Sequence, residues 1–105
     1  MTHEEVVQML TELDIPYAYD HFAEGESPQP PFICFLFPES ENFSADDAVY
    51  AAFNTLHLEL YTDKKSPDTE KKIEDILGCH ELFWQKSEVW IDSEKLYEVL
   101  YRMSV

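Results

Sequence analysis

The sequence predicts an α+β fold: an antiparallel or mixed β-sheet of four to five strands with two helices packed on one face. Two segments repeat apolar residues at helical spacing, and five others are short apolar runs or alternate with a period of two. Their order is helix, three strands, helix, two strands, which is typical of a sheet with segregated helices. A chain of 105 residues has room for a single domain, residues 1–105.

The first helix is predicted over residues 3–13. Thr2 and Glu5 have the spacing of a capping box. The apolar stripe that follows consists of Val6, Val7, Leu10 and Leu13. Pro16 follows this helix and favours its end, because proline disfavours the helical conformation for the preceding residue. Residues 17–22 are then predicted to form a short strand.

A proline-containing loop is predicted over residues 24–31, before an unbroken apolar run over residues 32–37. Such a short aromatic run is typical of a strand buried on both faces. Residues 39–47 are polar, and we predict a loop there. Between about residues 50 and 61, three leucines alternate with polar residues, which indicates a half-buried strand.

The second helix carries the clearest signals at its start. Ser66 and Pro67 fit an N-cap and a first-turn proline, and Asp68 and Glu70 place negative charge where the helix dipole favours it. The apolar stripe then consists of Ile73, Ile76 and Leu77. Gly78 follows this stripe and marks the expected end.

The C-terminal part is predicted to be a hairpin. Residues 83–91 are rich in aromatic and β-branched side chains, and residues 92–94 have the composition of a turn. Residues 95–105 fit both a helix and a strand by apolar spacing. We predict a strand, because consecutive strands joined by a short turn usually pair.

The charge excludes several classes of function. The chain has 22 acidic and seven basic residues, a net charge of -15. This charge repels nucleic acid and anionic membranes, so we expect neither as a partner. Two interpretations stand: a soluble assembly protein, or an acidic DNA mimic that inhibits a host nucleic-acid-binding enzyme. The sequence shows neither a signal peptide nor a membrane span, so we expect a cytoplasmic protein.

Residues able to carry chemistry are scattered. His57 and Glu59 share one face of a predicted strand, but a metal site needs three or four converging ligands. Cys34 lies within an apolar strand, which favours a buried, inert thiol, and Cys79 lies in an unrelated context, so we expect two free thiols. Two glycines are too few for a phosphate-binding loop. We therefore predict no catalytic residue, cofactor or metal.

Aromatic side chains near the C-terminus suggest a protein interface. Tyrosine and tryptophan are enriched at interfaces, and packing in the core explains them equally well. The acidic pair in the loop predicted over residues 39–47 is added to this hypothesis as exposed charge. The candidate interface residues are Trp84, Trp90, Tyr97, Tyr101, Asp46 and Asp47.

Two long segments, residues 58–65 (LELYTDKK) and 83–101 (FWQKSEVWIDSEKLYEVLY), resemble small proteins of Gram-positive tailed phages and prophages. Those proteins are encoded between the head–tail connector genes and the major tail gene. Residues 13–19 (LDIPYAY), 30–33 (PPFI) and 42–46 (NFSAD) resemble the same group. The resemblance spans almost the whole chain.

What the resemblance implies is a tail-completion or tail-terminator protein. Proteins of this type form a ring-shaped homo-oligomer, a hexamer, that caps the tail tube and docks to the head connector. The expected partners are therefore other copies of the chain, the tail tube and the connector. The expected location is the bacterial host cytoplasm during assembly and then the virion tail. The resemblance transfers no catalytic residue.

Overall fold

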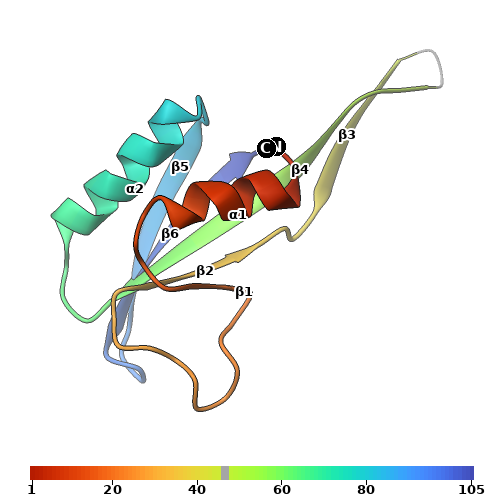
Figure 1. The fold of residues 1–105 in the computed structure, drawn as a ribbon. Helices are drawn as coiled ribbons and strands as arrows, with labels where there is room; N and C mark the ends of the chain where they lie inside the picture. The colour runs from red at the N-terminus through yellow and green to blue at the C-terminus, as the bar shows by residue number, and fades with distance from the viewer. Residues whose placement is uncertain (46–47) are drawn as a thin grey trace.

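The computed structural model describes the backbone of residues 1–45 and 48–105, and the side chains of residues 1–40 and 53–105. In chain order the elements are α1 (His3–Thr11), β1 (Tyr17–Tyr19), β2 (Phe32–Leu36), β3 (Ser40–Ala45), β4 (Ala48–Thr62), α2 (Pro67–Cys79), β5 (Trp84–Ile91) and β6 (Leu96–Ser104). Within these residues, five strands form a mixed sheet in the order β1-β2-β4-β6-β5, and β3 pairs with β4 beside this path. The predicted α+β fold is confirmed, with both helices on one face of the sheet (Figure 1).

Helix α1 begins as predicted and ends two residues early. The Thr2 hydroxyl accepts a hydrogen bond from the Glu5 amide at 3.1 Å, and the Glu5 carboxylate accepts one from the Thr2 amide at 3.0 Å. This capping box satisfies two amide groups that the first turn leaves unpaired. The helix ends before Asp14, whose φ of 54° lies in the left-handed region.

The hydrophobic core lies between the two helices and the sheet. Leu56, Leu58 and Leu60 on β4 all face it, because alternate strand residues share a face. The other buried core residues are Val6, Met9 and Leu10 on α1, Ile73 and Leu77 on α2, Ile33 and Phe35 on β2, Val99, Tyr101 and Met103 on β6, and Leu13, Ile15 and Val105 outside these elements. The predicted stripes of both helices therefore cover one side of the sheet.

Two of the predicted segments differ from the observed strands, and the ambiguous C-terminal segment is resolved. The loop predicted over residues 39–47 is wrong for residues 40–45, which form β3 and pair with β4. The strand predicted over residues 17–22 ends at Tyr19, because Asp20 adopts a left-handed φ of 64°. The ambiguous C-terminal segment is a strand, as predicted, and it pairs with both β4 and β5.

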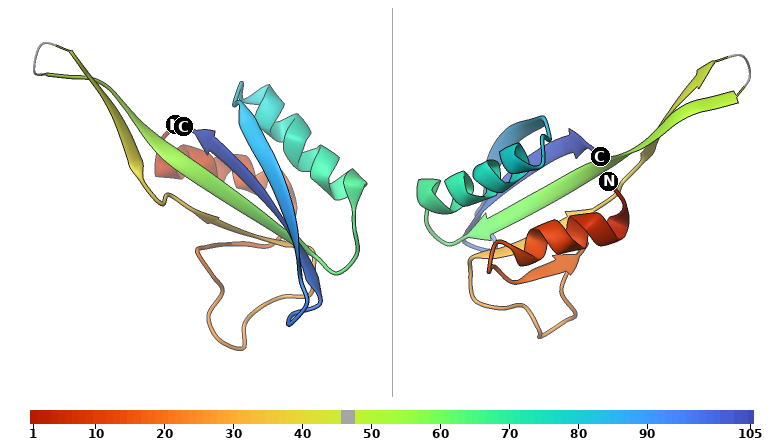
Figure 2. Two further views of the ribbon diagram at one scale, coloured as in Figure 1. Left: turned by 180° about the vertical axis from the view of Figure 1, so that it is seen from behind. Right: turned by 45° about the horizontal axis from the view of Figure 1, so that its top comes forward.

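Strands β3 and β4 form an arm that projects from the body (Figures 1 and 2). The first half of β4 pairs with β3, whereas its second half lies between β2 and β6. The molecule measures 50 × 29 × 23 Å, and its radius of gyration is 15.0 Å. A compact chain of this length has a radius of about 13 Å. The arm thus extends well beyond the core.

Charge is distributed unevenly along the chain and across the sheet. Residues 1–63 contain 13 acidic residues and no lysine or arginine. All seven basic residues lie between residues 64 and 102, in or next to α2, β5 and β6. Because β1 and β5 are opposite edges of the sheet, the β1 side lacks lysine and arginine, and the basic residues gather toward the β5 side.

Candidate interaction face

One face of the sheet is turned away from both helices, and we call it the open face (Figure 2, left). Strand register arranges its side chains in rows that cross β2, β4, β6 and β5. The three rows are Leu36–His57–Arg102–Gln85, Cys34–Glu59–Leu100–Ser87 and Phe32–Tyr61–Glu98–Val89. Most of these side chains are half-buried or exposed, so the face is accessible to a partner.

The β2 corner of the open face is covered by the loop that follows β1. Phe22 of this loop packs edge-on against Phe32, with ring centroids 5.5 Å apart. Phe32 also stacks on Tyr61 at 5.1 Å. These contacts place the loop beside the open face, at the edge opposite β5.

The part of the open face next to this corner is acidic. Burial raises the pKa of Glu59, and the nearby Glu98 carboxylate raises it further. Tyr61 donates a hydrogen bond from its hydroxyl to the Glu59 carboxylate at 3.4 Å. Burial also raises the pKa of the Cys34 thiol to about 11, with the Glu59 charge as the next cause. Cys34 is therefore a protonated, poorly nucleophilic thiol at neutral pH.

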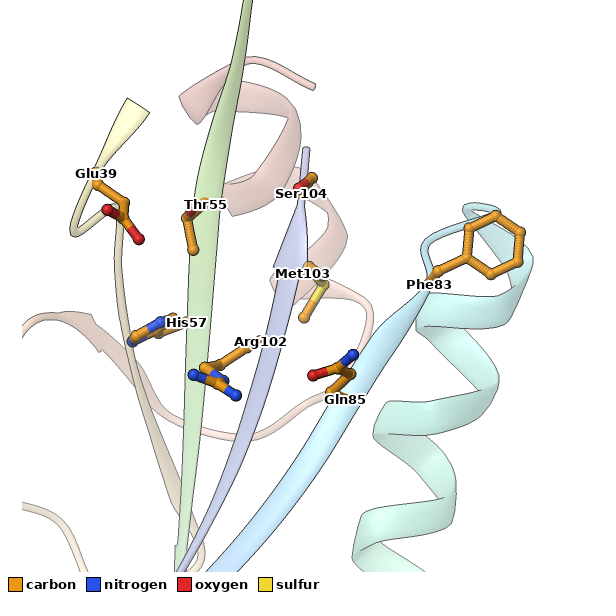
Figure 3. Close-up of a pocket in the computed structure, with 8 residues that line it drawn as sticks. All are labelled: Glu39, Thr55, His57, Phe83, Gln85, Arg102, Met103 and Ser104. Atoms are coloured by element: carbon orange, nitrogen blue, oxygen red, sulfur yellow. The ribbon is translucent and has the colours of Figure 1, made fainter. Parts of the chain in front are cut away.

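A shallow cavity of about 400 Å³ lies at the other end of the open face. It is lined by Glu39, Thr55, His57, Phe83, Gln85, Arg102, Met103 and Ser104. Figure 3 shows His57, Arg102 and Gln85 next to one another on β4, β6 and β5, with Phe83 at the start of β5. The cavity thus combines polar side chains with one aromatic ring.

The electrostatics of the cavity centre on Arg102, the single arginine of the sequence. Burial lowers the pKa of His57, and the Arg102 charge lowers it further, while Glu39 opposes both effects. His57 is therefore neutral at pH 7. Arg102 is the one lysine or arginine among the described side chains of the open face, and it forms no ion pair with them. The cavity thus contains a cation that no described carboxylate pairs with, although Glu39 also lines it.

Phe83 is the most exposed large apolar side chain among the described residues, with 92% of its surface accessible. An isolated exposed ring needs no explanation, but this one borders a cavity that contains an arginine. Aromatic and arginine side chains carry most of the energy at protein interfaces. Neither residue is among the interface candidates predicted from the sequence, although Arg102 is the single arginine of the chain.

The aromatic residues proposed for an interface lie on the helix-covered face instead. Tyr101 has 0% of its surface exposed and Trp84 packs edge-on against it at 5.4 Å, so both belong to the core, and the interface prediction is wrong for Tyr101. Trp90 is 42% exposed and packs on Tyr97 at 4.7 Å near the β5–β6 turn. This pair remains available to a partner.

The two acidic candidates, Asp46 and Asp47, lie outside the described residues. Among the described candidates, the structure pairs Trp84 with Tyr101 and Trp90 with Tyr97.

A charged network on the helix-covered side holds α2 to the sheet. The buried Glu70 carboxylate contacts the Lys65 ammonium at 2.7 Å and the Lys86 ammonium at 3.2 Å. Lys86 also contacts Glu74 at 2.9 Å, and Tyr101 donates a hydrogen bond to Glu74 at 2.8 Å. Because the buried Glu70 carboxylate has two opposite charges beside it, we assign this network to the folded structure and not to a binding site.

Within the part of the chain that the structure describes, no three His, Cys, Asp or Glu side chains are grouped as metal ligands would be. Neither described helix has the length and apolarity that crossing a bilayer requires. No protein-family model matches the chain, and no curated protein matches it either. The function proposed below is therefore based on the open face, the charge distribution and the sequence resemblance.

Proposed function

We propose that this protein is a non-enzymatic structural subunit of a tailed phage or prophage. It assembles into a ring of identical subunits, caps the tail tube and joins it to the head connector. The observation that carries the proposal is the open face, a sheet surface that no helix covers and that ends in a cavity bordered by an exposed aromatic ring. Surfaces of this kind are typical of protein–protein contact.

Support for the phage context comes from the segments that carry the resemblance. Residues 58–65 and 83–101 include the last five residues of β4 and most of the β5–β6 hairpin, which are neighbours in the sheet. The resemblance therefore covers the central framework of the fold. The projecting β3–β4 arm adds reach beyond the core, as a subunit that contacts several neighbours requires.

The acidity has a role in such a ring. Carboxylates that face a central channel repel the DNA backbone, so the DNA passes without binding. Carboxylates elsewhere oppose association of free subunits at low salt.

The proposal is tested by deleting the gene from its phage or prophage and examining the particles by electron microscopy. We expect tails of abnormal length or heads without joined tails, because an uncapped tube neither stops growing nor docks. Complementation with the wild-type gene is the control. Normal infectious particles without the protein would contradict the proposal.

The cation-free stretch of residues 1–63 favours one alternative, an acidic mimic of DNA that occupies the groove of a basic enzyme. The two functions differ in their partner. A mimic binds a DNA-binding protein at a fixed stoichiometry, and DNA competes with the mimic for that protein. A tail subunit binds its own copies and tail proteins. Co-purification from infected cells followed by DNA competition separates them.

A further inference from the structure

The cavity at the end of the open face has the features of a docking site for an acidic segment. Its cation, Arg102, has no carboxylate partner among the described side chains. Its neighbours in the row, His57 and Gln85, carry no charge at neutral pH. An arginine guanidinium presents several N–H donors in a fixed plane and binds a carboxylate through two of them.

Phe83 supplies the apolar part of this site. It precedes β5 at the rim of the same cavity, and Gln85 lies between it and Arg102 (Figure 3). A partner that covers both the ring and the cavity removes apolar surface from water and reduces the access of water to an ion pair at Arg102. Ion pairs shielded from water gain strength relative to exposed pairs.

The chain itself contains a fitting occupant at the opposite edge of the sheet. Residues 20–28, which we call the acidic loop, carry Asp20, Glu24 and Glu26, all exposed, and no lysine or arginine. Phe22 anchors this loop beside the open face at the β1–β2 edge. The cavity lies at the β4–β6–β5 side of the same face.

We propose that the cavity lined by Arg102 and Phe83 binds the acidic loop of a second copy of this chain. The contact is heterologous, because one surface of each subunit meets a different surface of the next, and contacts of this type generate rings. The uneven charge of the chain favours this pairing over a contact between two copies of the same edge. The inference rests on the proposed self-association and assigns the two surfaces that carry it.

The test compares four variants in sedimentation velocity, with thermal melting to check folding. Arg102→Glu and Phe83→Ala alter exposed side chains of the cavity and should weaken self-association about 10- to 30-fold. Lys72→Glu is the matched control: it makes the same charge change on an exposed residue of α2, and it should associate nearly as the wild type does.

The fourth variant, Glu24→Lys with Glu26→Lys, separates a local contact from the effect of net charge. It moves the net charge from -15 to -11, so a protein limited by general repulsion should associate more readily. Our proposal expects weaker association, because lysines then face Arg102. An equimolar mixture of this variant with Arg102→Glu should assemble, since every contact in an alternating ring is again between opposite charges.

The outcomes distinguish this inference from the proposed function. Wild-type protein that stays monomeric at every concentration and salt, together with normal particles in the deletion strain, overturns both. Wild-type protein that assembles while Arg102→Glu behaves like Lys72→Glu overturns the docking site and leaves the tail function standing. Loss in both charge variants without recovery in the mixture overturns the acidic loop as the occupant.

Discussion

The two cysteines differ in environment although neither is paired. Cys34 is 5% exposed on β2, and burial among carboxylates raises the pKa of its thiol to about 11, whereas Cys79 is exposed at the end of α2. Since the thiolate is the reactive form, iodoacetamide at pH 8 should label Cys79 and spare Cys34. Mass spectrometry of native and unfolded protein measures this.

The control for the thiol experiment is Cys79→Ser, which should remain unlabelled until denaturant is added. Rapid labelling of native Cys79→Ser would show that the β2 corner of the open face opens to solvent.

Single residues of α2 should differ in their contribution to stability. Ile73 is 1% exposed and packs in the core, whereas Ile76 is only partly buried. Ile73→Ala should lower the free energy of unfolding by about 2 to 5 kcal/mol, because it removes buried methyl groups and leaves a cavity. Ile76→Ala should cost clearly less. Urea unfolding of both variants checks the ranking, and equal losses would mean that α2 packs through another face.

At the scale of elements, α2 is attached to the sheet by charge as well as by apolar packing. Burial raises the pKa of Glu74. The hydrogen bonds that its carboxylate accepts from Lys86 and Tyr101 outweigh this effect and hold the pKa below its usual value. A carboxyl group with a depressed folded-state pKa contributes stability above its unfolded pKa and loses that contribution as the pH falls.

Removing the hydroxyl of Tyr101 tests this attachment. Tyr101→Phe should lower the free energy of unfolding by about 1 to 2 kcal/mol at pH 7, because Glu74 loses a hydrogen bond to its ionised form. The difference from wild type should shrink below about pH 4, where the carboxyl group protonates. Thermal unfolding of both proteins at pH 7 and at pH 3 measures this difference.

Tyr97→Phe is the control for Tyr101→Phe, since the Tyr97 hydroxyl forms no hydrogen bond within the described part of the chain. It should be neutral at both pH values. A loss at Tyr101 that is equally large at pH 3 and pH 7 would mean that the hydroxyl acts through packing alone.

Elements with local signals could be predicted from the sequence, and those set by pairing could not. The capping box at Thr2 specifies a helix start through hydrogen bonds within the first turn, and Pro67 does so through its fixed backbone angle. Strand β3 has no such signal, because it is defined by hydrogen bonds to β4. The cavity was missed for the same reason: His57, Arg102 and Gln85 become neighbours only through strand register.

On the scale of the whole molecule, one face of the sheet is covered by the two helices and the other face is open (Figure 2). The helix-covered face holds the core and the Glu70 network, which stabilise the subunit alone. The open face carries an acidic region near Glu59 and a cavity whose lining includes Arg102 and Glu39. A subunit with unlike surfaces at its two edges is suited to the head-to-tail assembly that we propose.

Self-association should strengthen as salt rises from about 0.02 to 0.3 M, where the Debye length falls from roughly 20 Å to below 8 Å. Each subunit carries a charge of -15, so repulsion between subunits acts over a longer range than the single contact at Arg102 and is screened first. Static light scattering at fixed protein concentration measures the change, and the Lys72→Glu variant should need more salt than wild type. Association that weakens steadily with salt would instead show that attraction between opposite charges, as at Arg102 and the acidic loop, outweighs the general repulsion.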